Sequence, residues 1–271
     1  MKYLYALILG LVQGLTEFLP VSSSGHLILF KHLFGMDAEM FGLTFDIALH
    51  FATLAAVCVV FREKILALIK KPFQTYTYLL IIATIPAALV GVFFDDYIEK
   101  ISQSGGFLGL AFLVTAAVLL IAEKTGKRIK DGEDIKFLDA TSIGIAQGIA
   151  VMPGISRSGS TLAAGMIMGL KKEAALDFSF MMSIPIILGS SVLGVKDIIE
   201  APAAVDFPVV LLGMIAAGLS GYFAIKFMLE FFKKHSLVWF SAYVAIAGVF
   251  VLFDQLVTNR FFEYFMVWNM G

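Results

Sequence analysis

Two stretches of the sequence decide the fold, GLVQGLTEFLPVSSSGHL (10–27) and GIAQGIAVMPGISRSGST (144–161). Each interrupts a long apolar run with serines, glycines and a proline, and the two align without a gap, residue 10 with residue 144. Chance similarity between apolar segments would match leucine and alanine, not Gln, Gly and Ser at fixed spacing. We therefore interpret the pair as an internal repeat. The shared residues are Gly10 and Gly144, Gln13 and Gln147, Gly14 and Gly148, Ser22 and Ser156, Ser24 and Ser158, and Gly25 and Gly159.

The composition is that of an integral membrane protein. Of the 271 residues, 59% are apolar and 15% are charged, whereas about 25% of the residues in a soluble domain are charged. The mean hydropathy is +0.91. Apolar runs recur toward the C-terminus and the first lacks a convincing cleavage site, so we expect the N-terminal segment to be retained. The runs are continuous rather than alternating, which predicts helices and not a barrel.

Six stretches have the roughly 17 to 25 apolar residues that a membrane-spanning helix needs. Two further apolar segments, 3–34 and 137–170, are broken near their middle by the polar clusters, which is typical of a re-entrant hairpin buried in protein. The sequence therefore predicts an all-α polytopic membrane protein with six transmembrane helices and two re-entrant helical hairpins. The six predicted spans are about 41–61, 75–94, 106–122, 174–195, 208–228 and 237–257.

Basic residues sort to one side of this topology. Four segments that would share the cytoplasmic side carry 14 of the 20 basic residues, as cytoplasmic loops usually do. Three spans separate the hairpins, so the two halves must have opposite orientations, with the first hairpin entering from outside. We predict one membrane domain over 1–271, made of inverted repeats at about 1–122 and 137–257 and joined by a basic cytoplasmic loop, 123–136. The basic segments are 62–74, 123–136, 171–173 and 226–236.

The positions at which the two copies differ indicate chemistry. An ionised side chain in the bilayer centre costs roughly 2.5 to 3.5 kcal/mol, so Glu17 and Arg157 should pair or line a cavity. A purely structural ion pair is the alternative, but it does not need the flanking serines and glycines. The first copy has Glu17, Ser23 and His26 where the second has Val151, Arg157 and Ser160.

Serines and glycines at the start of a helix leave backbone N–H groups free for an anion, and phosphate suits such a site. Arg157 adds a planar guanidinium group that can donate hydrogen bonds to two phosphate oxygens at once. Phosphoryl transfer would follow if Ser23 or His26 attacked phosphorus, with Glu17 as a base or a cation ligand and Arg157 stabilising the developing charge. The sequence leaves the nucleophile open.

Three motifs carry a family resemblance. QGLTE (13–17), LPVSSSGHL (19–27) and PGISRSGST (153–161) resemble motifs of the undecaprenyl-pyrophosphate phosphatases of the bacitracin-resistance type. The resemblance implies removal of the terminal phosphate from undecaprenyl pyrophosphate, which recycles the lipid carrier for cell-wall peptidoglycan synthesis. It also implies dependence on a divalent cation, Mg or Ca, and maps catalysis onto Glu17, Ser23, His26 and Arg157.

Further expectations follow for the site and its surroundings. Gln13 stands where the family often has Glu, so Glu17 is the candidate metal ligand with Gln13 nearby. We expect a bacterial plasma membrane location, an active site facing the periplasm or outside, and a polyprenyl pyrophosphate substrate held in lipid by its tail. The net charge of −1 gives no sign of a nucleic-acid partner, and a homodimer is left open. The expected phosphate-binding residues are Ser22, Ser24, Gly25, Ser156, Ser158, Gly159 and Thr161.

Two other functions compete with the enzyme. Inverted repeats with broken helices are a transporter architecture, so a transporter or flippase of lipid pyrophosphate or of a small anion is an alternative, with Glu17 and His26 as a proton relay. A structural or assembly protein is the third. Asp46 and His50 lie four residues apart in one span, where they either support the cavity or form a packing contact.

Overall fold

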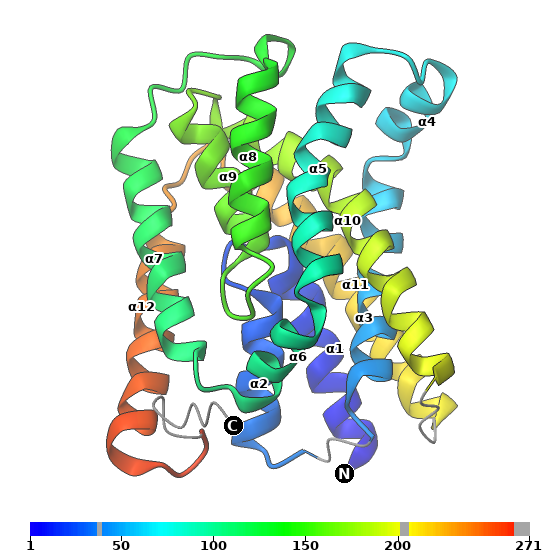
Figure 1. Ribbon diagram of the computed structural model, residues 1–271, viewed down its shortest axis with the longest axis vertical. Coiled ribbons are helices and arrows are strands. Elements are labelled where there is room, and N and C mark those ends of the chain that lie inside the picture. The colour runs from blue at the N-terminus through cyan, green and yellow to red at the C-terminus, as the bar shows by residue number, and fades with distance from the viewer. Residues whose placement is uncertain (37–39, 201–205, 263–271) are drawn as a thin grey trace.

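The computed structural model describes residues 1–36, 40–200 and 206–262, and its regular structure is helical (Figure 1). In these residues six helices are long and apolar enough to cross a membrane. They agree with the six predicted spans to within a few residues at each end, which confirms the prediction of an all-α multi-pass membrane protein. The six are α3 (Leu43–Val60), α5 (Thr75–Phe93), α7 (Leu108–Thr125), α10 (Lys172–Glu200), α11 (Phe207–Phe231) and α12 (Val238–Phe253), the last running into a π-helical turn, η2 (Asp254–Thr258).

Four shorter helices form two hairpins, α1 (Lys2–Phe18) with α2 (Ser23–Leu33), and α8 (Phe137–Ile149) with α9 (Arg157–Ile167). The first hairpin turns at Leu19, whose backbone is extended because the next residue is a proline. In Figure 1 the two hairpins lie toward opposite ends of the molecule and their turns meet near its middle. The Ser158 hydroxyl donates to the Leu19 carbonyl at 2.8 Å, which joins the two turns directly.

The repeated glycines let the hairpin helices pack closely on long helices. A Cβ at Gly14 of α1 would lie 2.0 Å from the Ser220 Oγ of α11, and one at Gly144 of α8 would lie 2.7 Å from the Ala83 carbonyl oxygen of α5. A side chain at either position would force the helices apart. The first helix of each hairpin therefore packs on a long helix of the other half of the chain.

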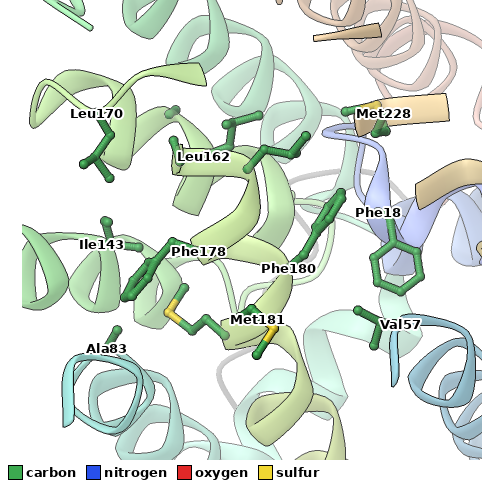
Figure 2. Packing of buried hydrophobic residues seen from close by; sticks show 14 of the residues in the cluster. Phe18, Val57, Ala83, Ile143, Leu162, Leu170, Phe178, Phe180, Met181 and Met228 are labelled. Carbon is green, nitrogen blue, oxygen red and sulfur yellow. The ribbon is translucent and has the colours of Figure 1, made fainter. Parts of the chain in front are cut away.

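The largest apolar cluster lies beside the hairpin turns (Figure 2). Phe18, the last residue of α1, packs edge-on against Phe180 of α10 with ring centroids 5.5 Å apart, and both rings are fully buried. Figure 2 shows Val57 of α3 beside Phe18. This packing fixes the end of α1, and with it the preceding residue, Glu17.

Three segments between the predicted spans contain short helices. α4 (Arg62–Lys70) and α6 (Asp95–Ser104) follow α3 and α5, and a 3-10 turn, η1 (Gly132–Asp134), lies in the predicted loop 123–136. Apolar residues in α4 recur three or four positions apart, as in Ile65, Leu68 and Ile69. Ile65 and Leu68 are partly buried and pack against the apolar core. The amphipathic period explains why this segment is helical although it is too polar to span a membrane.

The four basic segments come together at one end of the molecule. Lys64, Glu173 and Lys233 line one cavity there, and Arg128 and Lys171 line a second cavity with Lys233. The four basic segments thus lie at the same end of the molecule, as the sequence predicts.

Candidate active site

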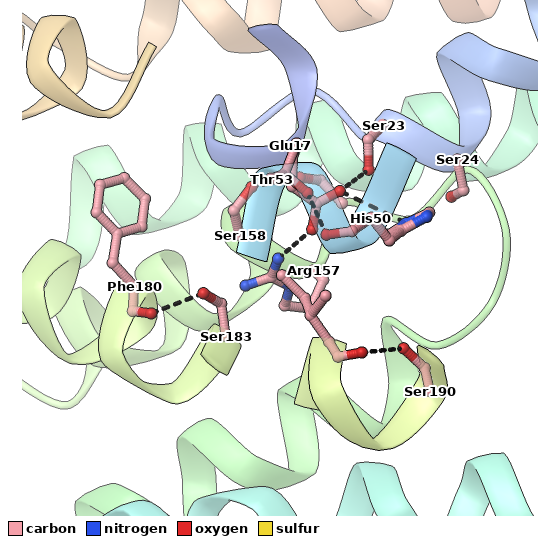
Figure 3. A network of polar contacts seen from close by, with 12 residues as sticks. Glu17, Ser23, Ser24, His50, Thr53, Arg157, Ser158, Phe180, Ser183 and Ser190 are labelled. Carbon is pink, nitrogen blue, oxygen red and sulfur yellow. Dashed lines mark hydrogen bonds and ion pairs between the residues drawn. The ribbon is translucent and has the colours of Figure 1, made fainter. Parts of the chain in front are cut away.

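Glu17 is the centre of a buried polar network formed where the hairpin turns meet (Figure 3). Its carboxylate is 5% exposed. One oxygen, Oε2, accepts hydrogen bonds from the Ser23 hydroxyl at 2.6 Å and from the Gln13 amide at 2.9 Å. The other, Oε1, accepts from Nη2 of Arg157 at 2.5 Å. The structure therefore brings together three of the four predicted catalytic residues, from both hairpins.

Arg157 is the first residue of α9, and its side chain is 15% exposed. Nη2 pairs with Glu17, whereas Nη1 is buried without a hydrogen-bond partner among the described residues. A buried donor left unpaired costs free energy, so it favours a ligand that can accept from it. Arg157 can thus bind an anion while its pair with Glu17 stays intact.

A cavity of about 190 Å³ adjoins this network. The polar residues that line it come mainly from α1, α2, α3 and α9, and the apolar ones come from the α8–α9 turn and α10. A lining with both a polar and an apolar part suits a ligand with a charged head and an apolar tail. The lining residues are Glu17, Ser22, Ser23, Ser24, His50, Gln147, Ala150, Val151, Ile155, Arg157, Ile186, Ile187 and Ser190.

His50 of α3 belongs to the cavity, although the sequence indicated it only as a supporting residue. Its Nδ1 bonds to the backbone carbonyl of Asp46 at 2.8 Å, and its Nε2 lies 3.7 Å from Oε2 of Glu17. The Asp46 carboxylate pairs instead with Lys31, at 2.6 Å. The available signal for His50 was a titratable residue on an apolar span, four residues after Asp46 and therefore on the same face of the helix.

His26 lies away from the cavity, and it is not among the described residues that line it. The ring is 1% exposed. Nδ1 bonds to the Ser22 carbonyl at 2.7 Å, and Nε2 bonds to the Tyr243 hydroxyl at 2.8 Å. Both ring nitrogens are thus engaged within the protein, so the geometry favours Ser23 over His26 as the group presented to a ligand.

The predicted phosphate-binding residues divide into two groups. Ser22 and Ser24 line the cavity with Ser23. The others take part in contacts within the protein: Ser156 caps α9 by accepting from the Gly159 N–H at 3.0 Å, Ser158 bonds to Leu19, Thr161 bonds to Ser179 at 2.6 Å, and a Cβ at Gly25 would meet Phe112 at 2.6 Å. Their role in phosphate binding stays a prediction.

The donors for a metal ion are few at this site. In the described residues no group of three or more His, Cys, Asp and Glu side chains could hold a metal. Among the residues that the structure describes, Glu17 is the one carboxylate lining the cavity, and Oε1 of the neighbouring Gln13 is buried without a partner. Mg²⁺ is commonly held by one or two carboxylates together with substrate phosphates and water. The residues present therefore fit a cation that is shared with a phosphate ligand.

The fold and the site together define a class: a multi-pass helical membrane protein with a buried carboxylate, a partly buried serine and a partly buried guanidinium beside a cavity that has a polar and an apolar part. Comparison with known proteins agrees with this class. The family profile described as "Bacitracin resistance protein BacA" matches residues 6–250, so the chain belongs to the bacitracin resistance protein BacA family.

Curated relatives match over nearly the whole chain. A protein of Carboxydothermus hydrogenoformans named Undecaprenyl-diphosphatase is 48% identical over 258 residues, which cover 94% of this chain and 98% of that protein. Undecaprenyl-diphosphatase 4 of Bacillus cereus (strain ZK / E33L) is 42% identical over 93% of this chain and 97% of its own length. An Undecaprenyl-diphosphatase of Rubrobacter xylanophilus is 39% identical over 90% of this chain and 94% of its own length.

Proposed function

We propose that this protein is an undecaprenyl pyrophosphate phosphatase. It removes the terminal phosphate to give undecaprenyl phosphate and inorganic phosphate, which recycles the lipid carrier for peptidoglycan synthesis. The observation that carries the proposal is the Ser23–Glu17–Arg157 network beside a cavity with a polar and an apolar part. Family membership and the names of the relatives support the same activity.

Ser23 is the proposed nucleophile. Its hydroxyl already donates to Glu17 at 2.6 Å, so the carboxylate can take the proton as Ser23 Oγ bonds to the terminal phosphorus. The bond from phosphorus to the bridging oxygen breaks, and undecaprenyl phosphate leaves with that oxygen. Water then attacks the phosphoserine, the bond from phosphorus to Ser23 Oγ breaks, and Glu17 returns its proton to Oγ, which restores the Ser23 hydroxyl. Inorganic phosphate leaves with the oxygen and the protons of the water.

Arg157 is the proposed electrostatic group. Phosphoryl transfer needs positioning and stabilisation of charge on the equatorial oxygens, for which a guanidinium is well suited. The unpaired Nη1 supports this role because it can donate to a phosphate oxygen while Nη2 remains on Glu17.

Glu17 and Gln13 are proposed to be the protein groups beside a divalent cation, Mg²⁺ or Ca²⁺, when pyrophosphate is bound. Glu17 would be the cation's protein ligand, with the amide of Gln13 nearby and the remaining ligands supplied by phosphate oxygens and water. When bound, the cation neutralises charge on the pyrophosphate.

The two hairpins are proposed to be re-entrant and the two halves to be inverted repeats. Contacts that recur at the repeat spacing support this: a Cβ at Gly14 would meet Ser220 of α11, and one at Gly148 would meet Pro86 of α5, the helix at the corresponding place in the other half. Ser22 and Ser156 cap α2 and α9 through the N–H three residues later. The homodimer stays a prediction.

The site is proposed to face the outside of the bacterial plasma membrane. The basic loops gather at one end of the molecule, and loops of this kind usually face the cytoplasm, so the other end would face outside. Ala150, Val151 and Ile186 in the apolar part of the cavity would contact the first isoprene units, while the rest of the tail stays in lipid.

Release of inorganic phosphate from undecaprenyl pyrophosphate by the purified protein in detergent tests the proposal. The wild type should release phosphate with turnover, and Ser23→Ala should lose at least about a hundredfold in kcat because the nucleophile is gone. The matched control is Ser236→Ala at the basic end, which should keep full activity. Movement of lipid across vesicle bilayers without phosphate release by folded protein would favour the transporter reading and overturn this one.

A further inference from the structure

The hydrogen bonds of His26 have a definite direction. A carbonyl oxygen can only accept, so Nδ1 must carry a proton and donate it to the Ser22 carbonyl, 2.7 Å away. In the neutral ring Nε2 is then an acceptor, and the Tyr243 hydroxyl donates to it at 2.8 Å. The two rings are stacked, with centroids 5.6 Å apart and planes 12° from parallel. Tyr243 therefore orients His26 from α12, a helix 217 residues further along the chain.

Ser22, whose carbonyl accepts the hydrogen bond from His26, has an unusual backbone conformation. Ser22 has φ +73°, a region that residues other than glycine rarely adopt and that often occurs at functional sites. Its counterpart in the second copy, Ser156, has φ −70°. The second copy has Ser160 in place of His26, and so lacks an imidazole on that carbonyl. The strained turn and its histidine thus occur together, in the copy that carries Glu17 and Ser23.

The strained turn sets the position of the proposed nucleophile. Ser23 is the next residue along the chain and the first of α2. Its hydroxyl donates a hydrogen bond to Oε2 of Glu17 at 2.6 Å. A small rotation of the Ser22 peptide would move the Ser23 hydroxyl away from the carboxylate. The Tyr243 side chain is 50% exposed, so a phenylalanine would be equally suited to a lipid-facing span. The hydroxyl is the part of Tyr243 that contacts His26.

We propose that Tyr243 is a positioning residue for the phosphatase reaction. Its hydroxyl orients His26, which donates to the Ser22 carbonyl and so maintains the hydrogen bond from Ser23 to Glu17. This inference rests on the proposed function and adds a residue from α12 to its machinery. Tyr243 is not among the described residues that line the cavity, so it acts through His26.

Tyr243→Phe tests the inference because it removes the hydrogen bond and keeps the stacked ring. We expect kcat for phosphate release to fall about tenfold, with KM within about twofold of the wild type, since substrate binding does not use this contact. The matched control is Tyr78→Phe on α5, another tyrosine about half exposed, which should keep wild-type kcat. Wild-type kcat in Tyr243→Phe would overturn the inference.

A double-mutant cycle with His26→Ala tests whether Tyr243 acts through His26. If it does, Tyr243→Phe has no further effect in the His26→Ala background, whereas an unchanged tenfold loss there would contradict the proposal.

A measurement without turnover separates this inference from the proposed function. The ¹⁵N resonance of the unprotonated ring nitrogen of His26 should move in Tyr243→Phe, and an unmoved resonance would overturn the hydrogen bond itself. Failure of the wild type to release phosphate would overturn the proposed function alone.

Discussion

Glu17 and Arg157 form a buried ion pair, and this determines how each should be tested. Removing one partner of a buried pair leaves an uncompensated charge, which costs about 3 to 5 kcal/mol when burial is complete. Both side chains are mostly buried here. An alanine at either position would therefore combine lost chemistry with lost stability, and substitutions that conserve shape are more informative.

Glu17→Gln separates the charge of Glu17 from its packing. The amide keeps the size of the side chain but cannot take a proton from Ser23, so we expect phosphate release to fall at least about a hundredfold. The control is Asp177→Asn, which likewise turns an ion-paired carboxylate into an amide, but beside Lys64 at the basic end. Retained activity in folded Glu17→Gln would remove Glu17 from proton transfer.

His50 should matter through the hydrogen bonds of its side chain. His50→Gln keeps a polar side chain that can reach the cavity, so phosphate release should stay within about fivefold of the wild type. His50→Leu has similar bulk and no polar atom, and should lose at least about tenfold, mainly through a higher KM, because one hydrogen bond to a charged ligand is lost. Steady-state kinetics on both variants gives the comparison, and equal activity in the two would contradict a role at the cavity.

At the scale of helices, the glycines of the hairpins are packing residues. Gly14→Ala places a Cβ 2.0 Å from Ser220 and 2.3 Å from the Ala217 carbonyl oxygen, so α1 must move away from α11. We expect a loss of roughly 1 to 3 kcal/mol in stability and a lower melting temperature in detergent.

The control for Gly14 is Gly91→Ala in α5. A Cβ there meets no atom within 4 Å, and alanine favours helix over glycine by about 0.5 to 1 kcal/mol. Gly91→Ala should leave the melting temperature unchanged or raise it, and a similar fall in both variants would show that the crossing of α1 and α11 is not the cause.

At the scale of the whole molecule, orientation in the membrane can be measured with single cysteines. The native Cys58 is replaced by alanine, and a cysteine is placed at Phe73 beside α4 or at Phe34 after α2, both of which are exposed. Phe34→Cys should react with an impermeant maleimide in intact cells, and Phe73→Cys only after permeabilisation. The reverse pattern would invert the proposed topology and place the open side of the site in the cytoplasm.

The sequence by itself determined the six spans, the two interrupted segments and the meeting of Glu17 with Arg157. These follow from local properties: the length of an apolar run, the breaking of a helix at a proline, and the high cost of an unpaired charge in lipid. The equal spacing of the two motifs was enough to predict that the Ser23 and Arg157 turns belong to one site.

Only the tertiary structure decided which neighbours complete that site. Spacing along a helix says which residues share a face but not which partner the face meets. His26 therefore points to Tyr243 rather than into the cavity, whereas His50 enters it from α3. The same holds for Gly25, Ser158 and Thr161, whose contacts with other helices arise from close packing of the hairpins. Packing between segments far apart in the chain set these roles, because each contact depends on how the helices cross.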